Sequence, residues 1–221
     1  MKLSMQRLQA EAEATGFRAE ILEKVIQLLH LLGTIQKHPF LRGRLALKGG
    51  TALNLFLFEV PRLSVDIDLN YIGAVPRDEM MTERPKIEDA LSAVFAREGF
   101  SIRRAPADHA GGRWALRYES ALGQGGNLEV DLNYMFRVPL WAPRSQDSRS
   151  IGSFQASNIP LLDIHELAAG KFAALLARNA SRDLYDVHKL FTVSHLERDR
   201  LRVAFVIYGA INRRDWRTGF R

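Results

Sequence analysis

Apolar positions recur with two different periods, which divide the chain into a mixed first part and a helical second part. Residues 18–36 carry Ile, Leu and Val at helical spacing, and Pro39 prevents this helix from continuing. Short apolar or alternating runs predict strands at 45–48 and 64–71, and a β-meander over 100–134. Further helices are predicted over 51–58, 85–98, 164–177, 182–191 and 196–211.

The segment over residues 139–160 gathers several prolines and predicts a connector between the two parts. We therefore expect an α/β domain with N-terminal helices over residues 1–138 and a helical domain over residues 139–221. The expected fold class is α+β, a sheet flanked by helices and followed by a helical region. We expect the active site to lie between the two parts, so that the second domain completes it.

Asp66 and Asp68 are the most informative polar residues of the chain. Successive side chains of a strand point to opposite faces, so Ile67 can enter a core while both aspartates share the other face. Two carboxylates this close repel each other unless a cation lies between them. Mg²⁺ is commonly held by one or two carboxylates together with phosphate oxygens. The pair therefore predicts a metal site, with Mg²⁺ as the expected ion and Mn²⁺ as an alternative.

Gly49 and Gly50 end the predicted strand that precedes the aspartates. Glycine lets the backbone approach a ligand closely, and a helix beginning directly after it aims free N–H groups at an anion. Ser64 shares the face of Asp66, and the guanidinium of Arg62 suits a phosphate group. These residues together predict a metal-dependent enzyme that acts on nucleotide phosphates.

Asp131 is a candidate third carboxylate. It lies in residues 127–133, where apolar and polar side chains alternate, so that its carboxylate faces away from the core. A neighbouring strand can place it beside Asp66 and Asp68, where it would hold a second metal or act as a general base. An edge strand with one face in water explains the same pattern equally well.

Two blocks of residues carry a family resemblance. The first is Lys-Gly-Gly-Thr-Ala-Leu at 48–53 with Arg-x-Ser-x-Asp-x-Asp at 62–68, and the second is Lys171 with Arg-Asp-x-x-Asp at 182–186. In order and approximate spacing they resemble the AbiEii/AbiGii toxin family of nucleotidyltransferases, which belongs to the DNA polymerase β-like superfamily. The resemblance spans roughly residues 44–190 by the order of these motifs.

The resemblance implies a polymerase β-like core and a reaction in which NMP passes from an NTP to an acceptor with release of pyrophosphate. It implies that Asp66 and Asp68 are catalytic metal ligands, joined by Asp131. Lys171 would face the charge of the triphosphate, and Asp183 would orient Lys171 or the acceptor. The nucleotide-binding residues would be Gly49, Gly50, Arg62, Ser64 and Arg178.

Several of these residues also have an ordinary structural explanation. The glycine pair suits a plain turn from strand to helix, and Lys171 suits a solvated helix surface. Asp183 lies near the start of a predicted helix, where a carboxylate is stabilised by the helix dipole, and Ser181 is the expected N-cap. The agreement of both blocks with one family favours the catalytic interpretation.

The composition narrows the chemistry and the setting. The chain of 221 residues has no cysteine, so disulfides and thiolate metal sites are excluded. It shows no nucleophile elbow for a Ser-His-Asp triad and no P-loop. No apolar stretch is long enough to span a bilayer and the N-terminus lacks a signal-peptide core, so we expect a cytoplasmic protein without membrane association.

The resemblance also implies partners: an NTP, an acceptor, and the cognate antitoxin of a toxin–antitoxin or phage-defence pair. The leading acceptor is RNA, and specifically the 3′ end of tRNA, to which some relatives add nucleotides. The net charge of +6 and the Arg-rich, aromatic segment 213–221 suit a nucleic acid, although +6 is equally compatible with ordinary solubility. The alternatives are a small-molecule or protein acceptor, or an inactive protein that binds nucleotide or RNA.

Overall fold

The chain forms two compact units. The computed structural model describes residues 3–105, 111–178 and 180–211. The first unit, here called the sheet unit, comprises Met1–Pro139 and Arg144–Leu161. The second, the helical unit, comprises Leu140–Pro143 and Leu162–Arg221.

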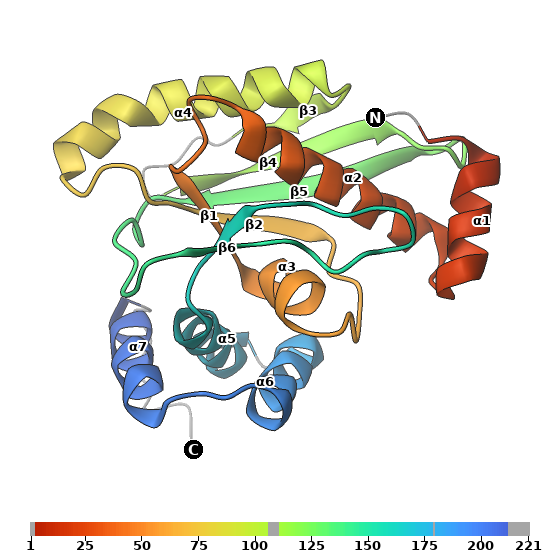
Figure 1. Ribbon diagram of the computed structural model, residues 1–221. Coiled ribbons are helices and arrows are strands. Elements are labelled where there is room, and N and C mark those ends of the chain that lie inside the picture. Colours follow the sequence, from red (N-terminus) through yellow and green to blue (C-terminus); the bar gives the residue numbers. More distant parts are fainter. Residues whose placement is uncertain (1–2, 106–110, 179, 212–221) are drawn as a thin grey trace. The chain divides into compact units, whose positions relative to one another are not determined.

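A seven-stranded mixed sheet, counted over the described residues, forms the centre of the sheet unit (Figure 1). The strands are β1 (Leu45–Lys48), β2 (Asp66–Tyr71), β3 (Ser101–Arg104), β4 (Gly111–Glu119), β5 (Gly125–Asn133), β6 (Arg144–Gln146) and β7 (Ile159–Leu161). They lie in the order β3-β4-β5-β2-β1-β7-β6, with β2 parallel to β5, β1 parallel to β7 and the other neighbours antiparallel. The aspartate-bearing strand β2 is therefore the central strand, and its register is set from both sides.

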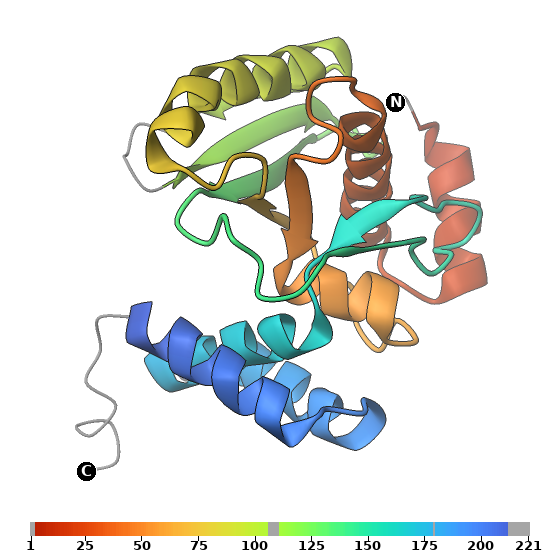
Figure 2. The same cartoon turned by 60° about the vertical axis from the view of Figure 1, so that its left-hand side comes forward.

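Two long helices cover one face of this sheet, α2 (Ala19–Lys37) and α4 (Arg77–Arg97) (Figures 1 and 2). Phe95 of α4 packs edge-on against Trp114 of β4, with their ring centroids 5.8 Å apart. The apolar residues of β5 alternate with polar ones, and Val130 is fully buried. Because strand side chains alternate between faces, the charged residues of β2, β4 and β5 lie on the face opposite these apolar ones.

The helix that follows the glycine pair starts two residues earlier than the sequence predicts. α3 (Gly49–Ala52) continues directly into a π-helical turn, η1 (Leu53–Leu57). The hydroxyl of Thr51 donates a hydrogen bond of 2.5 Å to the backbone carbonyl of Asp66. This bond ties the first turn of the helix to the first residue of β2, so the glycine turn is held beside the aspartates.

Other elements of the sheet unit differ from the prediction. N-terminal helices are expected, but the pattern gives no range for one before residue 18, where α1 (Met5–Thr15) forms, with Ser4 accepting a capping hydrogen bond from the N–H of Arg7. Only Leu8 of α1 is buried, so α1 has no apolar stripe to recognise. The predicted connector, 139–160, contains most of β6 and β7, which are three residues each and too short to show a period.

The helix predicted over 85–98 is longer than expected. α4 begins at Arg77, with Asp78 and Glu79 in its first turn, and Pro85 lies inside it. Proline in a helix interior removes one backbone hydrogen bond. The sequence therefore predicts that the helix begins at Pro85, and not that Pro85 lies inside it. Buried Met80, in the turn before Pro85, anchors the added part of the helix.

The described residues of the helical unit form three helices, α5 (Ile164–Arg178), α6 (Ser181–Val193) and α7 (Arg198–Ile211). The ring of Phe172 on α5 contacts Phe191 of α6 and Phe205 of α7, with centroids 5.1 Å and 6.1 Å apart. Buried Glu166 accepts a hydrogen bond of 3.2 Å from the hydroxyl of Tyr208. Burial raises the pKa of Glu166 above its ordinary value.

The observed architecture, a mixed sheet flanked by helices and accompanied by a helical unit, confirms the predicted α+β fold class. Within the described ranges, none of the helices has the length and apolar character that a membrane span requires.

Candidate active site

Asp66 and Asp68 occupy the first and third positions of β2, and both side chains are partly exposed. Ile67 between them is fully buried in the core. The two carboxylates thus share the charged face of the sheet, as the alternation along the strand predicts. Asp68 has Lys48 of β1 as its register partner on one side and Asp131 of β5 on the other.

The parallel pairing of β2 with β5 brings the third carboxylate beside the first two. Asp131 is aligned with Asp68, and Glu129 is aligned with Asp66. Arg113 of β4 binds both β5 carboxylates, with its Nη1 3.0 Å from Glu129 and its Nε 3.5 Å from Asp131. The sheet unit therefore presents a patch of four carboxylates, with an arginine on one side and a lysine on the other.

Gly49 makes a close approach to Asp68. Its φ of 72° lies in the left-handed region that favours glycine. A Cβ built on Gly49 would overlap the carboxylate of Asp68. Only glycine therefore allows this turn and this carboxylate to occupy their places together.

The remaining predicted residues of the sheet unit lie around this turn. Gly50 is buried in α3, and Ser64 is buried two residues before β2 begins. Arg62 is partly exposed and donates a hydrogen bond of 3.4 Å to the carbonyl of Leu63. The structure thus places Asp68 between the turn at Gly49 and Asp131 of β5, with Asp66 on the same face of β2, while the side chain of Arg62 engages its own loop.

The chemistry of this patch fits a hard divalent cation. Asp66 and Asp68 supply carboxylate oxygens from one face of a strand, and glycine at position 49 lets the backbone turn lie directly against the carboxylate of Asp68. Across the described ranges, however, no three side chains of His, Cys, Asp or Glu converge as a metal cluster. Arg113 holds Asp131 instead, so the aspartate pair of β2 is the donor set that the structure offers.

A second group of charged residues lies in the helical unit. The ammonium of Lys171 on α5 is 3.2 Å from Asp183 and 2.8 Å from Asp186, both on α6. Arg178 clamps Asp183 from the end of α5, with N–O distances of 2.6 Å and 3.0 Å. Both aspartates are fully buried and Lys171 is nearly so. Two cations and two anions thus balance inside a three-helix unit.

The environment of Asp183 favours its ionised form. Burial opposes ionisation of this carboxyl, but hydrogen bonds from Arg178 and the charge of Lys171 outweigh burial, and its pKa lies below the ordinary value. Asp183 is in the first turn of α6, but the N-cap is Ala180, without a side-chain cap, and not the predicted Ser181. Ser181 instead forms the first residue of the helix.

Sequence reasoning missed two residues of these groups. Asp186 enters the prediction only as the last residue of the Arg-Asp-x-x-Asp block, yet its carboxylate lies closer to the ammonium of Lys171 than that of Asp183 does. Its spacing of three from Asp183 places both on one side of a helix, which is a signal that the sequence contains. Arg113 is also missed, because its contacts depend on the register of β4 with β5. The predicted basic segment 213–221 lies outside the described residues.

The close approach at Gly49 has a measurable consequence. Gly49→Ala should be less stable than Gly43→Ala, although Gly43 has a similar φ of 75°. Both changes force alanine into the left-handed region at about 1–2 kcal/mol, but nothing lies within 4 Å of a Cβ at Gly43. Urea unfolding of the two variants isolates the overlap with Asp68. Equal losses in the two variants would show that the carboxylate moves away freely.

The buried charges of the helical unit should respond differently to single and double substitution. Lys171→Met leaves Asp186 buried without its cation and should lower the free energy of unfolding by about 3–5 kcal/mol. Lys171→Met combined with Asp186→Asn should be more stable than Lys171→Met alone, because the uncompensated charge is gone. Chemical denaturation of all three proteins and of Asp186→Asn measures the coupling. Additive losses would argue against a buried ion pair.

The family model described as "Nucleotidyl transferase AbiEii toxin, Type IV TA system" matches residues 30–216. MenT4, a nucleotidyltransferase toxin from Mycobacterium tuberculosis H37Rv, has a similar structure, with a TM-score of 0.67 and 22% identity over 91% of this chain and 70% of MenT4. The structure of ANT(2")-Ia in complex with adenylyl-2"-tobramycin has a TM-score of 0.52 and 14% identity, over 85% of this chain and 98% of ANT(2")-Ia.

No curated protein matches the chain. At these identities the two structures show a shared fold, whereas the family model covers most of the sequence. The match includes both blocks of motif residues, at 48–68 and 171–186. The chain belongs to the AbiEii family of nucleotidyltransferase toxins of type IV toxin–antitoxin systems.

Proposed function

We propose that this nucleotidyltransferase depends on Mg²⁺ and transfers NMP from an NTP to an RNA acceptor, with the 3′ end of tRNA as the leading candidate. The observation that carries the proposal is the aspartate pair of β2, whose Asp68 lies against the turn at Gly49. Oxygen ligands next to a backbone turn of glycine are what a metal-bound triphosphate requires. Mn²⁺ satisfies the same oxygen ligands and is the alternative ion.

In this proposal Asp66 and Asp68 hold the metal ion. When bound, the ion neutralises charge on the phosphate oxygens and orients the phosphorus that is attacked. The backbone of Gly49 and Gly50 is proposed to approach the phosphates, since glycine has no side chain that would keep a ligand away. Ser64 and Arg62 supply further hydrogen-bond donors to the nucleotide.

The proposed reaction exchanges one phosphorus–oxygen bond for another. The acceptor hydroxyl forms a bond to the α-phosphorus, while the bond from this phosphorus to the oxygen shared with the β-phosphate breaks. Pyrophosphate leaves with the bonding electron pair. Asp131 is proposed to accept the proton of the hydroxyl or to join in holding a second metal, since it is the register partner of Asp68.

Lys171, Asp183 and Arg178 are proposed to take part in the same reaction, which would make residues 139–221 part of the catalytic machinery. Lys171 has three N–H donors, and the contacts with Asp183 and Asp186 use two of them. The remaining donor is proposed to contact a phosphate oxygen, with Asp183 fixing the position of the ammonium. A Lys171→Met/Asp186→Asn protein that folds but does not transfer nucleotide would support this role.

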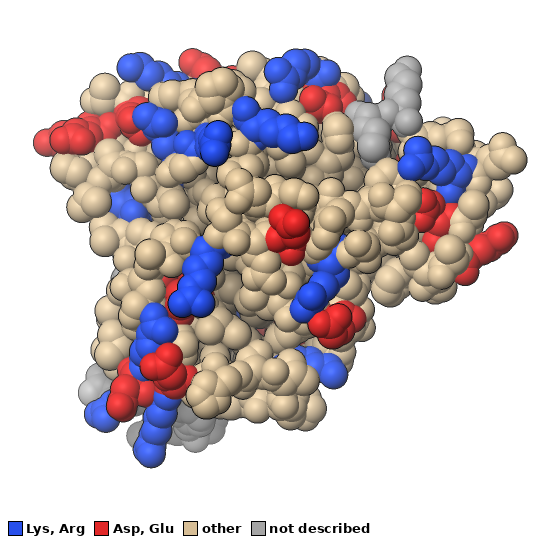
Figure 3. All heavy atoms as spheres, viewed as in Figure 1, with Lys and Arg blue, Asp and Glu red and all other residues tan. Residues whose placement is uncertain are grey.

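A type IV toxin implies an antitoxin partner and a nucleotide substrate. RNA as acceptor is supported by the net charge of +6. On the face shown in Figure 3, basic and acidic side chains are interspersed, so contacts to RNA on this face would come from local groups of arginine and lysine. We also propose that the protein acts in phage defence and is located in the cytoplasm.

Removing either aspartate of β2 should abolish transfer without harming the fold. Asp66→Asn and Asp68→Asn should each lower turnover at least about 100-fold, since even residues that only support a metal ligand are worth 10–100-fold. Without Mg²⁺ the variants should melt at or above the temperature of the wild type, because a repelling charge is gone. Turnover is measured with labelled NTP, and melting with and without Mg²⁺. Asp147→Asn, in the loop after β6, is the control.

The acceptor is identified by incubating the protein with each labelled NTP and total tRNA. For an RNA acceptor we expect label in tRNA, and binding whose log–log salt slope is about −0.7 for each phosphate contacted. A small molecule displaces few ions and should give a nearly flat dependence. A flat slope together with unlabelled tRNA would favour the small-molecule or protein acceptor. A small molecule is then the first alternative to assay, because the similar structure of ANT(2")-Ia is a complex with adenylyl-2"-tobramycin.

A further inference from the structure

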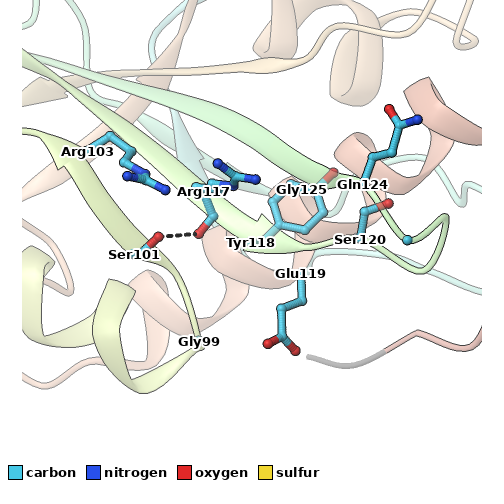
Figure 4. A pocket seen from close by; sticks show the side chains of 10 residues that line it. Gly99, Ser101, Arg103, Arg117, Tyr118, Glu119, Ser120, Gln124 and Gly125 are labelled. Carbon is cyan, nitrogen blue, oxygen red and sulfur yellow. Dashed lines mark hydrogen bonds between the residues drawn. The ribbon is translucent and has the colours of Figure 1, made fainter.

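A polar pocket of about 400 Å³ lies at one edge of the sheet unit, away from the aspartate pair. It is formed by β3, the end of β4 and the turn that leads into β5 (Figure 4). Two arginines line it from neighbouring strands, Arg103 on β3 and Arg117 on β4. Both side chains are exposed, and neither is paired with a carboxylate within the described ranges.

Two unpaired cations on adjacent strands repel each other and weaken strand pairing. The acidic residue of the pocket does not relieve this repulsion, because Figure 4 shows Glu119 pointing away from both arginines. An anion between the two guanidinium groups would turn the repulsion into attraction. Guanidinium groups bind phosphate oxygens in a bidentate manner, so phosphate is the anion that these residues suit best.

The wall of the pocket is held in place by its own hydrogen bonds. Glu23 of α2 is buried, and it accepts hydrogen bonds of 2.5 Å from the hydroxyl of Ser120 and 2.7 Å from the N–H of Ala121. The turn between β4 and β5 is thereby fixed to a covering helix. A side chain at Gly125 would overlap the guanidinium of Arg117, so glycine at this position leaves room for the arginine.

Strand register places this pocket on the same face of the sheet as the aspartates. Arg117 is aligned with Asn127 of β5, two residues before Glu129, which is aligned with Asp66. Side chains aligned in this way share one face. β4 and β3 are two and three strands from β2, which at the usual strand spacing is about 10–15 Å.

We propose that Arg103 and Arg117 bind backbone phosphates of the RNA acceptor, a few nucleotides from its reacting end. This inference rests on the proposed function, because it takes RNA as the acceptor. The strand would run across the open charged face, from the arginine pocket to the aspartate pair. Contacts of this kind position a nucleic acid and add affinity without reading its sequence. The pocket would therefore contribute to binding of the acceptor and not to binding of the NTP.

The test compares two double variants that remove the same charge. Arg103→Gln/Arg117→Gln should make the log–log salt slope of tRNA binding shallower by about 1.4, corresponding to two phosphate contacts. It should raise KM for tRNA and leave KM for the NTP unchanged. Lys37→Gln/Arg42→Gln, two exposed positions elsewhere in the sheet unit, should keep the slope and KM of the wild type. Melting temperatures establish that both variants fold.

The outcomes separate this inference from the proposed function. If wild-type protein binds tRNA with a steep slope and the arginine variant keeps it, the pocket does not bind phosphate and RNA remains the acceptor. If wild-type protein shows no slope and no label in tRNA, both proposals fall together. Arg103→Gln and Arg117→Gln as single variants should each remove half of the effect, and they carry the test if the double variant melts early.

Discussion

Asp68 lies between Asp131 of β5 and the backbone of Gly49, and the construction of the sheet unit keeps it there. Carboxylates on adjacent strands repel each other, so this arrangement must be imposed by other contacts. The helices α2 and α4 bury the apolar face of the sheet, which leaves the opposite face for charge. The bond from Thr51 to the carbonyl of Asp66 then fixes the glycine turn against β2.

The charged residues of the helical unit are arranged differently from those of the sheet unit, because they are paired with one another. In the patch around β2, four carboxylates stand beside only Lys48 and Arg113. In the helical unit, Lys171, Arg178, Asp183 and Asp186 instead cancel one another in a buried or half-buried setting. Buried ion pairs contribute little net stability, but their partners fix each other's positions accurately. The first arrangement suits the capture of a cation, and the second suits the rigid placement of a single ammonium.

Local patterns in the sequence predicted the structural features that depend only on residues close together along the chain. The alternation at 64–71 gave the shared face of Asp66 and Asp68, and the glycine pair marked the turn beside them. The sequence could not reveal that Arg113 binds Asp131, because that contact depends on which residues of β4 and β5 face each other. The short strands β6 and β7 were missed, and the range of the helix α1 was not predicted, for a related reason, since each buries too few side chains to leave a period.

The contact between Arg113 and the two carboxylates of β5 has a consequence for ion selectivity. The guanidinium is a cation built into the chain, and it already contacts one oxygen of each carboxylate, Oε2 of Glu129 and Oδ2 of Asp131. A second ion at Asp131 must therefore compete with an arginine whose local concentration is fixed by the fold. Such competition makes occupancy at Asp131 depend on the concentration of free divalent ions.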